Sequence, residues 1–312
     1  MENNILINNL RNEISKKVIG QKNMIDKILI GILTEGHILL EGFPGLAKSL
    51  TVNTIADTLG LKFSRIQFTP DLLPSDIIGT EIYNEKTGEF YIKKGPIFAN
   101  IILADEINRA PAKVQSALLE AMQEKQVTIA NETFSLERPF IVLATQNPIE
   151  QNGTYPLPEA QQDRFLMKVK VEYPTKEEEK EFLNLITGEN DFDDIKISTI
   201  LKKEDLDSLK SQVKKVYIDE KLKEYILNII FKTREQSQYI LCGASPRASI
   251  ALVKASKANA FLEGRDFVMP EDIKKVIYDV LRHRILLSYE AEANEKTVEE
   301  IIMEIIETVE LP

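Results

Sequence analysis

The chain has 312 residues, of which 43% are hydrophobic and 28% are charged. This composition excludes a disordered chain, and the length exceeds one ordinary core, so we expect about two domains. The 39 Lys and Arg residues against 49 Asp and Glu residues give a formal charge of −10, which argues against a large basic surface for nucleic acid. With Cys242 as the one cysteine and His37 and His283 as the two histidines, a disulfide framework is excluded and a catalytic transition-metal site is disfavoured.

The apolar runs are also too short for a membrane protein. Ile101–Ala104 is typical of the longest ones, whereas a membrane span needs roughly 18 residues. Met1–Lys17 contains acidic residues, unlike a secretory signal. We therefore expect a cytoplasmic protein without a signal peptide, lipid anchor or membrane segment.

Between Val18 and Val171, short apolar runs alternate with segments of helical periodicity. The helical segment Ala112–Glu124 has apolar residues at positions i, i+3, i+4, i+7 and i+8, which predicts a stripe packed on a core. Alternation of this kind indicates an α/β domain with a parallel sheet. The expected strands are His37–Glu41, Phe63–Gln67, Ile101–Ala104, Phe140–Thr145 and Leu166–Val171.

Two β-hairpins are expected as insertions in this domain. Glu81–Asn84 and Glu89–Ile92 flank a turn that contains Gly88, and Val127–Ile129 and Thr133–Leu136 flank a second turn. Phe90 and Tyr91 of the first hairpin could contact a partner, but packing across the hairpin is the favoured interpretation.

Beyond Pro174 the pattern becomes helical. Thr175 and Glu178 have capping-box spacing, and further helices are expected to start at Ser245, at Pro270 and near Thr297. We expect residues 1–173 to form the α/β domain and residues 174–312 to form an all-α domain.

The segment from Gly42 to Ser49 has the context of a phosphate-binding loop, because it follows an expected strand and opens an expected helix. In such loops backbone N–H groups surround phosphate oxygens, a lysine balances the phosphate charge and a hydroxyl binds magnesium. Lys48 and Ser49 fit the last two roles. Ala47 stands where glycine is usual, which is compatible if it begins the helix with a negative φ. The remaining residues of the loop are Gly42, Phe43, Pro44, Gly45 and Leu46.

Two carboxylates follow the buried strand Ile101–Ala104. Ligands of open α/β sheets lie beyond the carboxyl ends of the strands, so Asp105 is expected to help hold Mg²⁺. Glu106 would point the other way in an extended chain and polarise a water for attack on a γ-phosphate. On their own, the two acids could also favour the start of the next helix.

Three further residues are candidates for the same nucleotide site, although each also has a purely structural interpretation. Asn147 follows the strand Phe140–Thr145, and its amide could orient the attacking water, although a turn role before proline is an alternative. Arg164 could be a surface ion-pair partner. Arg247 falls in the first turn of the helix after Ser245, where a cation is disfavoured by roughly 0.3 to 1 kcal/mol unless an anion compensates; a nucleotide phosphate would be such an anion.

The order of these motifs resembles that of the AAA+ ATPases. Their amino-acid sequences resemble those of the MoxR branch, over about Val18 to Arg284. The matching segments are the phosphate-binding loop with its alanine and the runs Ala104–Pro111, Ala144–Pro148, Leu157–Phe165 and Gly243–Ala248. The resemblance implies an AAA+ P-loop domain followed by a helical lid, with ATP and Mg²⁺ as cofactors.

The resemblance also implies residue roles. Lys48 and Ser49 would be Walker A, Asp105 and Glu106 Walker B, Asn147 sensor 1 and Arg164 the arginine finger. Arg247 would be sensor 2, reaching from the lid to the γ-phosphate, and Val18-Ile19-Gly20-Gln21 would pack on adenine. Arg109 would act at a subunit interface or support the next helix. An arginine finger acts across an interface, so the implied assembly is a hexameric ring.

The implied function is ATP hydrolysis that remodels or matures a client protein, for example one with a von Willebrand factor A domain. Two alternatives stay open from the sequence. One is a nucleic-acid motor, which the net charge of −10 disfavours. The other is a nucleotide-gated scaffold with little turnover, which the presence of Glu106, Asn147 and Arg164 disfavours.

Overall fold

The computed structural model describes residues 2–148, 153–188, 192–235 and 237–311. The helices are α1 Glu2–Ser15, α2 Lys22–Thr34, α3 Lys48–Thr58, α4 Pro74–Ile78, α5 Ala112–Glu124, α6 Glu159–Gln162, α7 Lys176–Ile186, α8 Lys203–Lys215, α9 Glu220–Lys232, α10 Pro246–Leu262, α11 Pro270–Leu281, α12 Tyr289–Ala293 and α13 Val298–Thr308. The strands are β1 Ile38–Glu41, β2 Phe63–Gln67, β3 Gly79–Asn84, β4 Glu89–Lys94, β5 Ile101–Asp105, β6 Gln126–Ile129, β7 Glu132–Ser135, β8 Ile141–Gln146, β9 Met167–Lys170, β10 Ile240–Cys242 and β11 Leu286–Leu287. Short 3₁₀ turns cover Ile107–Arg109 and Phe192–Asp194.

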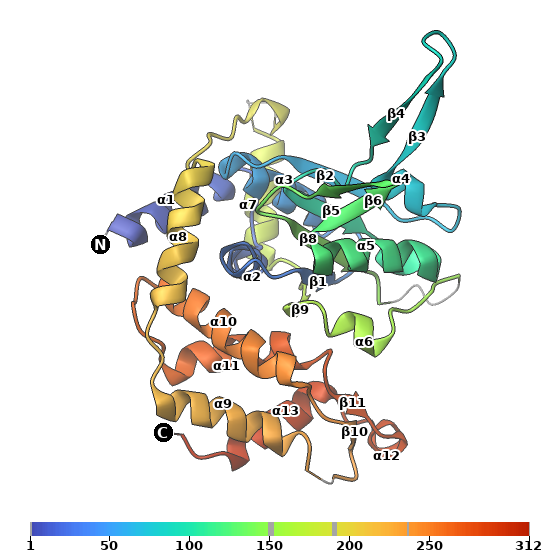
Figure 1. Ribbon diagram of the computed structural model, residues 1–312. Helices are drawn as coiled ribbons and strands as arrows, with labels where there is room; N and C mark the ends of the chain where they lie inside the picture. Colours follow the sequence, from blue (N-terminus) through green and yellow to red (C-terminus); the bar gives the residue numbers. More distant parts are fainter. Residues whose placement is uncertain (1, 149–152, 189–191, 236, 312) are drawn as a thin grey trace.

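One parallel sheet organises the first half of the chain, in the order β2-β5-β8-β1-β9 (Figure 1). Its strands are the five expected from the sequence, and each end lies within one residue of its expected place. Because the strands are parallel, their carboxyl ends share one edge and their amino ends share the other. We call these the carboxyl edge and the amino edge.

The sheet is covered on both faces because successive side chains of a strand point to opposite sides. Ile38 and Leu40 of β1 belong to a core formed with α1, α2 and α3, whereas Leu39 belongs to a second core formed with α4 and α5. Helix α5 has the bounds that its apolar stripe predicts, and four residues of that stripe, Val114, Leu118, Ala121 and Met122, are buried.

The helices α9–α13 form a separate layer beside the amino edge, drawn in orange and red in Figure 1. We call them the lid. Helix α10 packs on α2, α11 packs on β9, and the first of the two cores continues from the sheet into the lid as far as Ile305. The predicted helix starts at Ser245, Pro270 and Thr297 are confirmed, with Ser245 and Thr297 capping α10 and α13.

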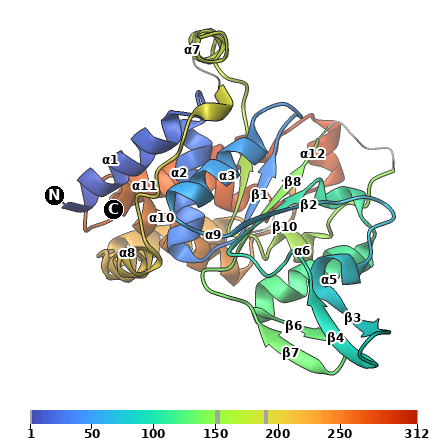
Figure 2. The same cartoon turned by 90° about the horizontal axis from the view of Figure 1, so that it is seen from above.

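The second half of the chain is helical as expected, apart from one small antiparallel addition. Ile240 of β10 pairs with Leu287 of β11 in a small antiparallel piece. Two strands of two and three residues are too short to show an alternating pattern. Helix α7, by contrast, begins with the expected capping box at Thr175 and stands apart from the body of the molecule in Figure 2, with none of its residues buried.

Both expected hairpins are present, and β3–β4 projects far from the sheet in Figure 1. Tyr83 pairs with Phe90 across this hairpin, with ring centroids 5.1 Å apart, as the packing interpretation predicts. Phe90 and Tyr91 nevertheless remain exposed. Among the described residues, no helix combines the length and apolar character that crossing a membrane requires.

Candidate active site

The loop between β1 and α3 lines a cavity of about 380 Å³ at the carboxyl edge. The fold brings Lys48, Ser49, Asp105, Glu106 and Asn147 together there from three separate strand ends. The other residues that line the cavity are Pro44, Gly45, Leu46, Ala47, Leu50, Arg65, Gln67 and Thr145. These five residues, which sequence reasoning assigned to phosphate, magnesium and water, therefore share one space.

Lys48 folds back over the loop, and its Nζ donates a hydrogen bond to the carbonyl of Gly42 over 2.7 Å. Partial burial lowers the pKa of Lys48, and the charges of Asp105 and Glu106 oppose that effect. Two expected binding residues do not line the cavity. Gly42 packs against Val171, and the ring of Phe43 stacks on Tyr173 with centroids 5.3 Å apart. These two residues support the loop through contacts with Val171 and Tyr173, outside the cavity.

Ala47 is the first correction to the sequence interpretation. Its φ is +52°, so it caps α3 in the left-handed region instead of beginning the helix with a negative φ. Gly45 is also left-handed at +83°, whereas Leu46 between them is not. Alternation of this kind turns successive backbone N–H groups toward one concave surface, which suits an anion. The cost of left-handed geometry at an alanine is roughly 1–2 kcal/mol.

A second cavity of about 340 Å³ adjoins the first and shares Pro44, Gly45, Leu46, Ala47 and Leu50 with it. Its remaining lining is mostly apolar and comes from the N-terminal segment and from the region of α7: Lys17, Val18, Ile19, Gln21, Tyr173, Pro174, Glu178, Glu179, Phe182 and Leu183. The segment Val18–Gln21 and the loop thus border one apolar space, which suits a flat aromatic base.

The carboxylate of Asp105 is held from two sides. Oδ1 accepts a hydrogen bond from the hydroxyl of Thr145 over 2.7 Å, and Oδ2 accepts one from Nε of Arg65 over 3.0 Å. Asp105 is largely buried, so these partners fix the direction in which its oxygens face the cavity. An oxygen ligand fixed in this way suits a magnesium ion.

Glu106 is the second correction. The backbone turns left-handed at this residue, with φ +56°, so the chain is not extended here. Its carboxylate accepts hydrogen bonds from Nε2 of Gln67 over 2.8 Å and from Arg109 over 3.0 Å. The Glu106 N–H donates to Thr145 over 2.8 Å. The turn therefore keeps Glu106 in the same cavity as Asp105, and Arg109 supports Glu106 directly.

Thr145, Arg65 and Gln67 are partners that the sequence analysis missed. Arg65 and Gln67 lie on β2 and Thr145 lies on β8, the two strands beside β5. Gln67 pairs with Asp105, and Ala144, the residue before Thr145, pairs with Ala104. A polar residue at or next to the same register position of a neighbouring strand is the signal that could have found Gln67 and Thr145, whereas Arg65 pairs with Leu103, two residues before Asp105. This signal becomes visible only once the strand order is known.

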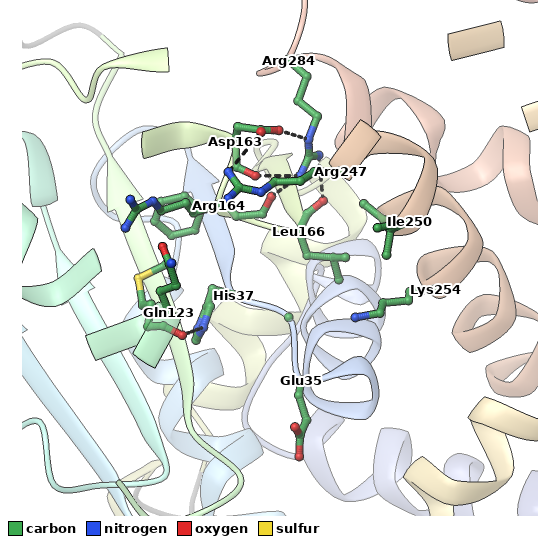
Figure 3. A pocket seen from close by; sticks show the side chains of 14 residues that line it. Glu35, His37, Gln123, Asp163, Arg164, Leu166, Arg247, Ile250, Lys254 and Arg284 are labelled. Carbon is green, nitrogen blue, oxygen red and sulfur yellow. Dashed lines mark hydrogen bonds and ion pairs between the residues drawn. The ribbon is translucent and has the colours of Figure 1, made fainter. Parts of the chain in front are cut away.

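Arg164 and Arg247 lie elsewhere, around a pocket of about 250 Å³ that Figure 3 shows. Asp163, Arg284 and Lys254 line the same pocket. Arg164 precedes β9 and its side chain is exposed, as is that of Arg247. The pocket is at the amino edge, where the N–H of Leu166 bonds to the carbonyl of His37 over 2.7 Å.

The position of Arg247 is the third correction, because it does not reach toward the loop of its own chain. His37 and Gly42 lie at opposite ends of β1, five residues of strand apart, which separates the two edges by roughly 16 Å. The anion beside Arg247 in this structure is Asp163, with Oδ2 3.4 Å from the guanidinium. That carboxylate compensates the unfavourable position of a cation in the first turn of α10.

Among the described residues, no group of three or more His, Cys, Asp or Glu side chains is arranged to hold a metal ion. A magnesium site built from Ser49 and Asp105 would draw its remaining ligands from phosphate and water, as Mg²⁺ sites commonly do.

Comparisons with known proteins agree with this geometry. Residues 37–167 match the ATPase family associated with various cellular activities (AAA), and residues 232–305 match the AAA lid domain. The chain is 47% identical over 308 residues to Chaperone MoxR1 of Mycobacterium tuberculosis, covering 96% of this chain and 81% of that one. It is 46% identical over 299 residues to YeaC of Bacillus subtilis, covering 96% and 92%.

A solved structure of a candidate ATPase from Cytophaga hutchinsonii superposes with a TM-score of 0.92 at 53% sequence identity, covering 100% of this chain and 96% of that one. The fold is therefore an AAA+ domain with a central parallel sheet and a helical lid. Taken together, the cavity at the carboxyl edge, the lid and the relatives establish that the chain belongs to the MoxR family of AAA+ ATPases.

Proposed function

We propose that the chain binds Mg²⁺-ATP in the two adjoining cavities and hydrolyses the γ-phosphate. The observation that carries this proposal is the convergence of Lys48, Ser49, Asp105, Glu106 and Asn147 on one cavity. Residues that only formed a strand-turn-helix corner would not require a lysine, two carboxylates and an amide from three strands to meet there.

In this proposal each cavity binds a different part of the nucleotide. The apolar space beside Val18 and Ile19 would take the adenine ring. The concave backbone from Gly45 to Ala47 and the ammonium of Lys48 would bind the phosphates. The hydroxyl of Ser49 and the carboxylate of Asp105 would hold Mg²⁺, which supplies charge neutralisation on the phosphates when bound.

Glu106 and Asn147 would act on the attacking water. Glu106 is the general base in this proposal, and its hydrogen bonds from Gln67 and Arg109 hold the carboxylate in a fixed direction. The amide of Asn147 offers both a donor and an acceptor, so it can orient the same water without competing for the proton.

Arg164 and Arg247 complete the proposed site from a neighbouring subunit. They lie at the amino edge, roughly 16 Å of strand away from the loop that holds the phosphates of their own chain. An arginine that stabilises the charge of phosphoryl transfer can be supplied by another molecule. We therefore propose a ring, with six subunits as in the family resemblance, in which each amino edge faces the nucleotide of the next chain.

The biological role that we propose is remodelling or maturation of a client protein, in the cytoplasm. The name of the relative Chaperone MoxR1 supports a chaperone-like role. A client with a von Willebrand factor A domain is our candidate. We further propose a division near Pro174, with residues 1–173 binding nucleotide and residues 174–312 forming the helical part.

The test uses three single variants. Lys48→Ala should abolish nucleotide binding, since the loop loses its one cation. Glu106→Gln should bind ATP normally and lose roughly 10²- to 10⁴-fold in kcat, the usual range for a general base. Glu263→Gln is the matched control, because it neutralises an exposed carboxylate of the lid that pairs with Lys275. Normal phosphate release by Glu106→Gln would contradict the assignment of the base.

A further inference from the structure

The carboxylate of Asp163 holds the loop of Arg164 and the helix of Arg247 together, through ion pairs with Arg284 and with Arg247 itself. Oδ1 of Asp163 accepts from Nε of Arg284 over 2.8 Å. Oδ2 accepts from the hydroxyl of Ser245 over 2.9 Å and from Arg247 over 3.4 Å. Figure 3 shows Asp163, Arg247 and Arg284 directed toward one another at one end of the pocket.

Arg284 is a buried cation, and all of its hydrogen-bond donors have acceptors. Its side chain is 2% exposed, and its guanidinium makes five hydrogen bonds, as many as it has N–H groups. The acceptors are Oδ1 of Asp163 and the carbonyls of Asp163, Phe165, Leu166 and Val280. Burial lowers the pKa of Arg284, and Asp163 is the counter-charge that opposes this effect.

These contacts fix the backbone on both sides of Arg164. The carbonyl of Asp163 before it and the carbonyl of Phe165 after it both accept from Arg284. His283 adds a contact from its Nε2 to Phe165, 3.2 Å away. The loop is therefore held while the Arg164 side chain itself stays exposed at the pocket.

The same carboxylate fixes the start of α10. Ser245 is the N-cap of that helix, and its hydroxyl accepts from the N–H of Arg247 while it donates to Asp163. Asp163 thus touches Arg284 through one oxygen and the N-terminus of α10 through the other. A shift of either element would break contacts to the second one.

We propose that Asp163 and Arg284 form a latch that joins the loop of Arg164 to the lid helix of Arg247, so that both arginines meet a neighbour's nucleotide at a fixed spacing. This inference rests on the proposed function. Asp163, Arg284 and Ser245 are positioning residues, because they act through the two arginines and leave the loop and carboxylates of their own nucleotide cavity untouched.

The first measurement is the split between KM and kcat. Asp163→Asn should leave the KM for ATP unchanged and lower kcat roughly 10- to 100-fold, the effect of a misplaced catalytic group. Ser245→Gly is the second variant, since it removes the bridge to Asp163 while glycine still serves as an N-cap at little cost. It should lower kcat in the same direction with intact folding. Ser288→Gly is the matched control, because Ser288 caps α12 in the same way without touching Asp163.

The second measurement mixes variants in one ring. Arg164→Ala mixed with Lys48→Ala should regain turnover, since one chain supplies the loop and the other the arginines. Asp163→Asn mixed with Lys48→Ala should gain turnover in the same way, whereas Asp163→Asn mixed with Arg164→Ala should show no gain over the low turnover of the two variants alone. The absence of a gain in the last mixture places both residues on the same side of the interface.

The outcomes separate the two proposals. If the mixture of Arg164→Ala and Lys48→Ala stays inactive, the arrangement across subunits in the proposed function is wrong. If that mixture is active but Asp163→Asn and Lys48→Ala together show no gain in turnover, the defect of Asp163→Asn lies in folding or in its own cavity, and the latch is refuted. Wild-type kcat in Asp163→Asn or in Ser245→Gly would also overturn it.

Discussion

Thr145 offers the sharpest test of how the cavity is built. Its hydroxyl is buried, donates to Oδ1 of Asp105 over 2.7 Å and accepts from the N–H of Glu106 over 2.8 Å. One oxygen atom therefore links the end of β8 to the two carboxylate residues at the end of β5, Asp105 and Glu106. Thr145→Val keeps the shape of the side chain and removes both hydrogen bonds.

The cost follows from these two contacts. A hydrogen bond to a charged group contributes about 1.5–3 kcal/mol, and a buried N–H without a partner costs about 1–3 kcal/mol. Since the two effects overlap at one site, we expect Thr145→Val to lower the free energy of unfolding by about 3 kcal/mol. Loss of a group that orients a metal ligand should also weaken magnesium-dependent turnover roughly 10- to 100-fold.

Two control variants isolate the hydroxyl. Thr145→Ser keeps it and should retain most of the turnover. Thr58→Val removes another buried hydroxyl, one that bonds to the carbonyl of Thr54 inside α3, and should cost only about 1 kcal/mol. Urea denaturation and the magnesium dependence of phosphate release give the two readouts. The reasoning fails if Thr145→Val is as stable as Thr58→Val and keeps the wild-type magnesium dependence.

Two further predictions concern the lid side of the molecule. Burial lowers the pKa of His37 from 6.5 to about 4 and that of His283 in the same direction, so the unfolded chain binds more protons below pH 6.5. Stability should therefore fall with falling pH, by about 2 kcal/mol from His37 alone between pH 7 and pH 5; denaturation midpoints that are equal at the two pH values would contradict this. At Gly243 an added Cβ would overlap the backbone carbonyl of Thr233, so Gly243→Ala should displace Arg247 and lower kcat with the KM for ATP unchanged, and wild-type kcat in steady-state assays would disprove that role.

The sequence was sufficient for the elements that local pattern determines. The five strands of the sheet and α5 were found nearly to the residue, because each is an apolar run bounded by turn residues or a stripe of helical period. Lys48, Ser49, Asp105, Glu106 and Asn147 were also predicted to meet. Parallel strands carry their ligands at one shared edge, so the strand assignment alone brings these residues together.

The sequence was insufficient where the structure depends on the sign of a φ angle or on contacts between residues far apart in the chain. Ala47 and Glu106 are left-handed, although neither residue type favours that region. Their conformations come from the loop and the turn around them. Asp163 and Arg284 are 121 positions apart, and no local pattern links them. Arg247 was expected beside its own loop because motif order gives no information on which edge of the sheet the lid packs against.

The packing of the lid has a consequence for how nucleotide binding could be communicated. Besides the latch, Arg282 donates to the carbonyl of Lys168 over 2.6 Å, and buried Lys27 of α2 pairs with Asp279 over 2.7 Å. Breaking a buried pair by removing one partner is strongly unfavourable, so these contacts resist a swing of the lid away from its own sheet. On the proposed ring, a change at one nucleotide would then move the neighbouring sheet and lid as one body. On the same proposal, the carboxylates at one edge and the arginines at the other would make turnover depend on assembly, since neither edge would hold a complete site.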